Sequence, residues 1–186
     1  MQFRYCPSCR SSEIRFEDGK AYRCASCGFL YFHNVATAAG ALVIAGEKLV
    51  FIVRAKEPAA GLLALPGGFV DPGESAEAAV RRECREEIGW EPQEMEFLSS
   101  FPNRYEYAGI LYNTCDLFFV VRAPLLLPED LTPDPKEAAG IVFLRPEDVA
   151  LERLAFDSTR MAVSTFLTGG RGRRRLDVTD RYILQK

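Results

Sequence analysis

The stretch GFVDPGESAEAAVRRECREEIGW, which runs from Gly68 to Trp90, decides the fold class of this 186-residue chain. It begins as a loop, because Pro72 fixes its own φ and Gly73 accepts a positive φ. No Gly or Pro occurs from Ala76 until Gly89, and Ala, Glu and Arg dominate this interval. We therefore predict a helix over the interval, with the Ser75 side chain as its N-cap.

Three carboxylates crowd one side of the predicted helix. Glu83, Glu86 and Glu87 fan over an arc of roughly 100° at the helical repeat. Like charges at this spacing destabilise an isolated helix by about a few tenths of a kcal/mol, which a bound cation would offset. Hard divalent cations prefer carboxylate and carbonyl oxygens, so we predict a Mg²⁺ or Mn²⁺ site here, with a backbone carbonyl near Gly68 as a further ligand. The alternative is a solvated acidic face held by ion pairs.

The spacing of the fixed residues follows the pattern G-x5-E-x7-R-E-U-x-E-E-x-G-U, in which U is bulky and apolar; Cys84 and Trp90 stand at the U positions. The segment thus resembles the Nudix box of the Nudix hydrolases. The resemblance implies an α/β protein, an α/β/α sandwich around a mixed sheet, which hydrolyses a nucleoside diphosphate linked to another moiety. It also implies that Glu83, Glu86 and Glu87 hold the metals. From the residues alone, Arg82 can pair with Glu86 or with Glu74, and the resemblance favours Glu74 as its structural partner.

The N-terminal region carries two C-x2-C pairs, Cys6 with Cys9 and Cys24 with Cys27. Four thiolates at this spacing are typical of a structural Zn²⁺ site, so we predict a zinc ribbon over residues 1–32. Two disulfides or unrelated cysteines are the alternatives. The ribbon has five basic and three acidic residues and several aromatic side chains. We expect it to support the structure or a homodimer rather than to bind nucleic acid.

A ribbon followed by a Nudix domain over residues 33–168, with a basic tail over 169–186, resembles the NADH pyrophosphatases and related ribbon-bearing Nudix proteins. The NADH pyrophosphatases carry S-Q-P-W-P-F-P-x-S after the box, whereas this chain has SSFPNRY over residues 99–105. This difference favours the related group, whose substrates include ADP-ribose, FAD and dinucleotides.

Several residues outside the box are candidates for substrate binding and proton transfer. Arg54 and Arg104 have guanidinium groups that suit a diphosphate. Tyr105, Tyr107 and Phe101 can stack on a base, or they can simply pack the edge of a loop. Glu137 matches a late-loop glutamate of Nudix enzymes, so the general base is Glu137, Glu86 or a metal-bound water alone.

Alternating and apolar runs predict the remaining elements. We expect strands over 36–45, 49–54, 94–100, 114–121 and 141–144, a loop over 101–107, and a helix capped by Asp157 or Ser158 that runs to about Leu167.

Composition limits the class of function. A net charge of −3 argues against general polyanion binding, and we expect no nucleic acid partner. No apolar run approaches a membrane span, and no signal peptide is visible, so we expect a cytoplasmic protein. The sequence predicts a metal-dependent hydrolase of a pyrophosphate bond in a compound such as ADP-ribose, FAD or NADH. The alternatives are a non-catalytic nucleotide-sensing regulator and an RNA 5′-end pyrophosphohydrolase.

Overall fold

The computed structural model describes residues 3–107 and 109–169. Its Cα positions fall into two compact units. Among the described residues, the first unit combines those up to Ala36 with Arg104–Asn113, and the second combines Thr37–Asn103 with those from Thr114 onward. Among the described residues, no helix is long and apolar enough to cross a membrane.

The first unit contains a three-stranded antiparallel sheet in the order β1-β2-β3. The strands are β1 (Ile14–Glu17), β2 (Ala21–Cys24) and β3 (Leu30–Phe32). Phe16 pairs with Tyr22, and Tyr22 pairs with Tyr31, so three rings form a row across one face. Phe3 lies over this row, with its ring centroid 4.6 Å from that of Tyr22. Of these rings only Tyr22 is buried, and it forms a small core with the buried Cys6, Ala21 and Cys24.

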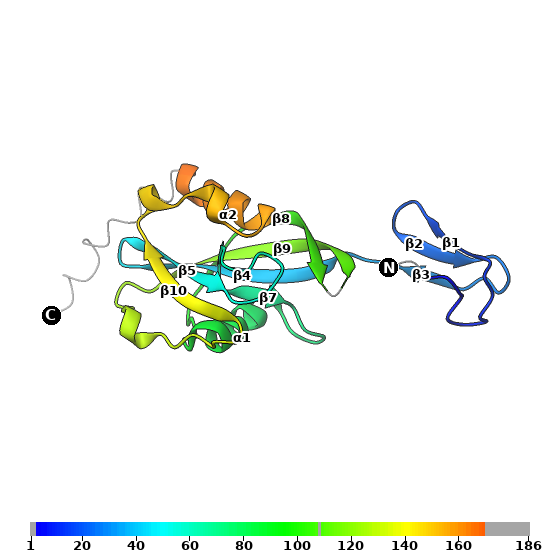
Figure 1. Cartoon of the computed structure of the whole chain (residues 1–186), viewed down its shortest axis with the longest axis horizontal. Helices are drawn as coiled ribbons and strands as arrows, with labels where there is room; N and C mark the ends of the chain where they lie inside the picture. The colour runs from blue at the N-terminus through cyan, green and yellow to red at the C-terminus, as the bar shows by residue number, and fades with distance from the viewer. Residues whose placement is uncertain (1–2, 108, 170–186) are drawn as a thin grey trace. The chain divides into compact units, whose positions relative to one another are not determined.

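A seven-stranded mixed sheet, whose main path is β10-β5-β4-β9-β8, lies mostly in the second unit, and its Arg104–Asn113 end groups with the first. Its strands are β4 (Ala36–Ala45), β5 (Lys48–Arg54), β6 (Leu63–Ala64), β7 (Gly67–Phe69), β8 (Glu96–Tyr107), β9 (Ile110–Arg122) and β10 (Ala138–Leu144). Helix α1 (Ala76–Ile88) lies against one face of the sheet and α2 (Asp157–Thr168) against the other (Figure 1). Three short 3-10 helices span Pro128–Asp130, Pro146–Asp148 and Leu151–Arg153. The predicted α/β/α sandwich with a mixed sheet is confirmed.

Helix α1 has the predicted ends. The Ser75 hydroxyl accepts a hydrogen bond from the Ala78 N–H, and Gly89 closes the helix in the left-handed region at φ 70°. The side chains of Val80, Cys84 and Ile88 are fully buried in the core between α1 and the sheet. Cys84 at a U position of the box therefore acts as a small core residue.

Two sequence-based predictions were wrong. The predicted loop over 101–107 is instead the second half of β8, which forms a long hairpin with β9. Neither Asp157 nor Ser158 caps α2: the N-cap residue is Phe156, and it has no side-chain cap bond. The Ser158 hydroxyl donates to Asp116 instead. Residues 170–186, almost all of the predicted tail, lie outside the described residues.

Candidate active site

Glu87 is the most deeply placed of the three box glutamates. Only 7% of it is exposed, and its Oε2 accepts a hydrogen bond of 2.8 Å from the Gly67 N–H. Burial raises the pKa of Glu87 to about 8, although the Gly67 N–H opposes this shift. A carboxylate held this far from water favours a partner cation or a proton.

Glu83 lies beside Glu87 against the backbone of β7. Its side chain is 14% exposed, and burial is the main cause that raises its pKa. The backbone of Gly68 runs so close to it that an added Cβ would collide with the Glu83 carboxylate. At Gly67, an added Cβ would collide with the backbone carbonyl of Ala39 on β4. Gly67 therefore allows β7 to lie close to β4, and Gly68 allows β7 to meet the acidic face of α1.

Arg82 connects the loop before α1 to the acidic face. Its Nε and Nη2 donate to the two carboxylate oxygens of Glu74 at 3.0 Å each, and Nη2 also donates to the Phe69 carbonyl at 2.9 Å. Its Nη1 donates to Glu83 at 2.7 Å and to Glu86 at 3.2 Å. The bonds to Glu74 are the main cause that raises the pKa of Arg82, and the same bonds lower the pKa of Glu74. Both pairings considered from the sequence are thus present at once.

Glu86 and Glu137 form the open side of the cluster. The Glu86 side chain is 55% exposed, and that of Glu137 is 44% exposed. Burial is the main cause that raises the pKa of Glu83, and the negative charges of these two carboxylates raise it further. Glu137, just before β10, pairs with Lys56 at 2.5 Å. The late-loop glutamate therefore lies within electrostatic reach of the box glutamates, although the two segments are far apart in the sequence.

Arg54, at the end of β5, is a predicted phosphate-binding residue within electrostatic reach of this cluster. Burial is the main cause that raises the pKa of Glu87, and the positive charge of Arg54 is among the influences that lower it. Its Nε donates to the Pro58 carbonyl at 2.9 Å, and its guanidinium carbon lies 4.9 Å from the centroid of the Phe156 ring. Arg54 is thus held by two contacts while it remains partly exposed.

The other predicted substrate residues all lie in the second half of β8. Arg104, Tyr105 and Tyr107 fall in the stretch that groups with the first compact unit, whereas the box belongs to the second, so their role in substrate binding stays a prediction. Phe101 is partly buried against the apolar cluster on the α2 side, with its ring 6.3 Å from that of Phe118. Packing, the alternative considered for the loop aromatics, accounts for Phe101.

The four ribbon cysteines converge. The ligand atoms of Cys6, Cys9, Cys24 and Cys27 all lie within 4.8 Å of one another, and within the described residues this is the one such group of potential metal ligands. All four thiols are free of disulfides, so the disulfide alternative is not what the structure shows. Burial opposes ionisation of Cys24, but backbone N–H groups and neighbouring thiols lower its pKa to about 7. Soft thiolates in this number fit a tetrahedral metal ion such as zinc.

Sequence reasoning missed a polar network on the α2 side of the sheet. Asp116 is 7% exposed, and its Oδ2 accepts hydrogen bonds from Asn103 Nδ2 at 3.0 Å and from Ser158 Oγ at 2.6 Å. The only signal in the sequence is that an acidic residue, Asp116, stands directly before the apolar run Leu117–Val121. Such a residue is easily read as one that points to solvent.

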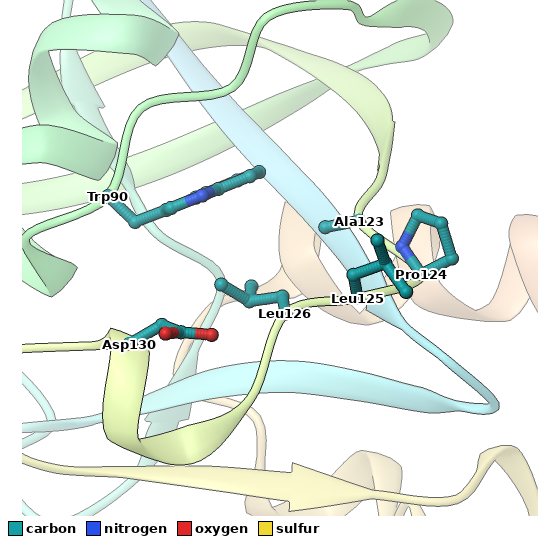
Figure 2. Close-up of a pocket in the computed structure, with 6 residues that line it drawn as sticks. All are labelled: Trp90, Ala123, Pro124, Leu125, Leu126 and Asp130. Atoms are coloured by element: carbon teal, nitrogen blue, oxygen red, sulfur yellow. The ribbon is translucent and has the colours of Figure 1, made fainter.

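A separate pocket of about 420 Å³ lies beyond the end of α1 (Figure 2). Its lining residues are Trp90, Ala123, Pro124, Leu125, Leu126 and Asp130. Trp90, at the last U position of the box, packs partly against the core and partly lines this pocket. None of the box glutamates lines it.

The NUDIX domain model matches residues 35–164, which is more than half of the chain. The chain belongs to the NUDIX domain family. The match covers the acidic cluster, Arg54 and Glu137, and it ends within α2.

Curated relatives of this NUDIX chain are hydrolases by name. The NAD-capped RNA hydrolase NudC of Stutzerimonas stutzeri is 32% identical over 118 residues, which cover 58% of this chain and 42% of that protein. NudC of Deinococcus radiodurans is 29% identical over 116 residues, 61% of this chain and 41% of that protein. The ADP-ribose pyrophosphatase of Methanocaldococcus jannaschii is 40% identical over 93 residues, 49% of this chain and 51% of that protein. The chain spans about two fifths to one half of the length of these relatives.

Solved NUDIX structures share the fold. A NUDIX hydrolase of Nitrosomonas europaea matches with a TM-score of 0.66 at 20% identity, over 91% of this chain and 92% of that one. The NUDIX domain of Shewanella oneidensis NrtR, solved with ADP ribose, matches with a TM-score of 0.61 at 22% identity, over 77% of this chain and 90% of that one. At these identities the likeness shows the fold alone.

Proposed function

We propose that this chain is a divalent-metal-dependent hydrolase that cleaves the pyrophosphate bond of a nucleoside diphosphate linked to another moiety, such as ADP-ribose, FAD or NADH. The observation that carries the proposal is the pair of shielded carboxylates, Glu83 and Glu87, beside the Gly67–Gly68 backbone. Structural needs alone do not explain two such carboxylates, because burial of each one disfavours its charged form.

The chemistry of the donor set suits a hard divalent cation, although among the described residues only the ribbon cysteines, and not the box glutamates, converge to within 4.8 Å. Glu83, Glu86, Glu87 and the Gly68 carbonyl would hold Mg²⁺ or Mn²⁺, since these ions take carboxylate and carbonyl oxygens. Such an ion, when bound, neutralises charge on a diphosphate and favours attack by water. Glu74 and Arg82 hold the helix and the preceding loop together and do not act on the substrate.

Two further residues would act on the substrate itself. Arg54 supplies a partly exposed guanidinium beside Glu87, which suits the charge of a diphosphate. Glu137 is a candidate to accept the proton of the attacking water; Glu86 is the other candidate in the chain. Water adds to one phosphorus, the bridging P–O bond breaks, and the leaving phosphate departs with its electron pair.

The test compares Glu86→Gln with Glu77→Gln, a control on the exposed first turn of the same helix. With ADP-ribose and Mg²⁺, Glu86→Gln should lower kcat by about two or more orders of magnitude, because a charge on the reacting diphosphate is left without compensation. Glu77→Gln should retain activity, and both variants should melt close to the wild-type temperature. Full turnover by folded Glu86→Gln would remove Glu86 from the site.

A second substrate class is favoured by the relatives. The NudC proteins are named for hydrolysis of NAD-capped RNA. We propose that RNA ending in a nucleoside diphosphate group is the alternative substrate of the same acidic cluster. Comparing kcat/KM for a free dinucleotide and for a short RNA capped by it distinguishes the two classes.

The four cysteines would hold a structural Zn²⁺, which we propose for the first unit on the basis of their convergence.

The division of the chain into domains at residues 32 and 168, the homodimer and the cytoplasmic location remain predictions.

A further inference from the structure

Asp116 is a buried carboxylate that the proposed chemistry does not use. It lies on β9, outside the acidic cluster, and only 7% of it is exposed. Within the part of the chain that the structure describes, its Oδ1 has no hydrogen-bond partner, and neither does Thr114 Oγ1 two residues earlier on the same face. Buried polar atoms without partners lower stability and are rare in folded proteins.

The other oxygen of Asp116 ties three elements together. Oδ2 accepts from Asn103 on β8 and from Ser158 in the first turn of α2. Ser158 is 1% exposed, and its bond to Asp116 is 2.6 Å long. A directional bond of this kind fixes where a helix begins, whereas an apolar contact would let the helix slide over the sheet. The network therefore sets the register of α2 on the sheet.

The start of α2 is also where Arg54 is held. Phe156 is the N-cap residue of α2, two residues before Ser158, and its ring faces the Arg54 guanidinium carbon at 4.9 Å. The segment before it is fixed as well, since Ala155 N–H donates to the Leu63 carbonyl at 2.8 Å. A shift of the first turn of α2 would move the Phe156 ring and leave the bond to the Pro58 carbonyl as the remaining contact of the pair that holds Arg54.

We propose that Asp116 and Ser158 are positioning residues, which fix the first turn of α2 so that the Phe156 ring holds Arg54 toward the diphosphate of the substrate. The position of Arg54 follows from its contacts with the Pro58 carbonyl and the Phe156 ring, while its target rests on the proposed function. A displacement of about 1 Å in a substrate-binding group can lower turnover or binding strongly.

The first readout is independent of activity. Protons above the face of an aromatic ring are shifted in NMR spectra, so the Arg54 side-chain signals report its place over Phe156. Ser158→Ala should move these signals toward the values of a free arginine. Ser164→Ala, a half-buried serine later in the same helix, is the matched control and should leave them unchanged. Unchanged Arg54 signals in folded Ser158→Ala would overturn the proposal.

The second readout is kinetic and uses ADP-ribose as the probe. Ser158→Ala should raise KM by about tenfold with kcat little changed, a size typical of coupled residues. In an Arg54→Ala background it should add nothing, because the group that it positions is gone. Additive effects in the double variant would show a general structural role and overturn the proposal. Should Ser158→Ala fail to fold, Asn103→Ala loosens Asp116 from the β8 side and should give a smaller rise in KM.

The two proposals fail separately. If Arg54→Ala itself leaves KM unchanged, Arg54 does not bind the diphosphate and the proposed function loses that residue. The NMR comparison of Ser158→Ala with Ser164→Ala still decides whether the network positions Arg54.

Discussion

At the residue scale, the carboxyl group of Glu87 couples folding to pH. Its pKa is raised from 4.5 to about 8 by burial, so the folded chain binds a proton between these values that the unfolded chain has lost. In zinc-loaded protein without added Mg²⁺ or Mn²⁺, stability should therefore fall as pH rises from about 4.5 to about 8. The loss should amount to a few kcal/mol, since one pKa unit is worth about 1.4 kcal/mol. Urea unfolding at pH 5, 7 and 9 measures it.

Glu87→Gln is the control for this prediction, because glutamine can still accept the Gly67 N–H bond and does not titrate. Its stability should depend less on pH than that of the wild type. Added Mg²⁺ should restore wild-type stability most at the highest pH, where the carboxylate is charged. Parallel pH profiles for the two proteins would contradict the assignment of Glu87 as the titrating group.

Gly68 tests the fit between β7 and the acidic face. Gly68→Ala should push the Glu83 carboxylate aside and lower kcat by about tenfold or more, because misplaced groups lose much of their effect in catalysis. Gly140→Ala is the matched control: it lies in β10, and its added Cβ would meet no atom within 4 Å. Equal activity of the two variants would show that Glu83 tolerates the displacement.

At the element scale, the attachment of helix α1 to the segment before it depends on the several N–H donors of the Arg82 guanidinium. Arg82→Lys keeps the charge but loses the paired bonds to Glu74 and the bond to the Phe69 carbonyl, so it should destabilise the fold by about 1–3 kcal/mol. Arg85→Lys, whose side chain is 58% exposed and pairs with Glu91, should change stability by less than about 1 kcal/mol. Thermal and urea unfolding compare them, and similar losses for both would contradict a bracing role for Arg82.

The elements differ in how far the sequence predicts them. Helix α1 was predicted with its cap and its end, because the Ser75 bond and the Gly89 conformation depend on neighbouring residues. The second half of β8 was missed because Pro102, Asn103 and Arg104 are typical of loops, and only pairing with the distant β9 makes them a strand. Ser158 was predicted as a cap because its partner, Asp116, is 42 residues away, and no local pattern reveals such a bond.

At the scale of the whole molecule, the acidic cluster is assembled from segments that the sequence keeps apart. The box supplies three glutamates, which their spacing revealed, whereas the nearness of Glu137 and Arg54 to Glu87 depends on the sheet. Ala55 N–H donates to the Glu137 carbonyl, so the pairing of β5 and β10 brings Arg54 and Glu137 close together. No local pattern predicts such a pairing, and only the resemblance pointed to Glu137.

The two compact units should also respond differently to loss of zinc. Cys24→Ser should remove one metal ligand and unfold β1–β3, because a sheet with so small a core depends on its metal. The second unit has its own apolar core and should keep slow amide exchange in α1 and β5. Hydrogen exchange measures this, with Cys115→Ser, outside the cluster, as the control. Loss of protection throughout both units would contradict independent cores.

Cleavage of a pyrophosphate bond in ¹⁸O-labelled water is the measurement that tests the central claim most directly. The purified, zinc-loaded chain would be incubated with ADP-ribose, FAD, NADH and a dinucleotide-capped RNA, in the presence of Mg²⁺ or Mn²⁺. The products would be identified by mass spectrometry. We predict metal-dependent release of a nucleoside monophosphate from at least one of them, one ¹⁸O atom on a product phosphate, and loss of the reaction in Glu86→Gln. Absence of cleavage across the whole set, or cleavage that persists in Glu86→Gln, would contradict the account.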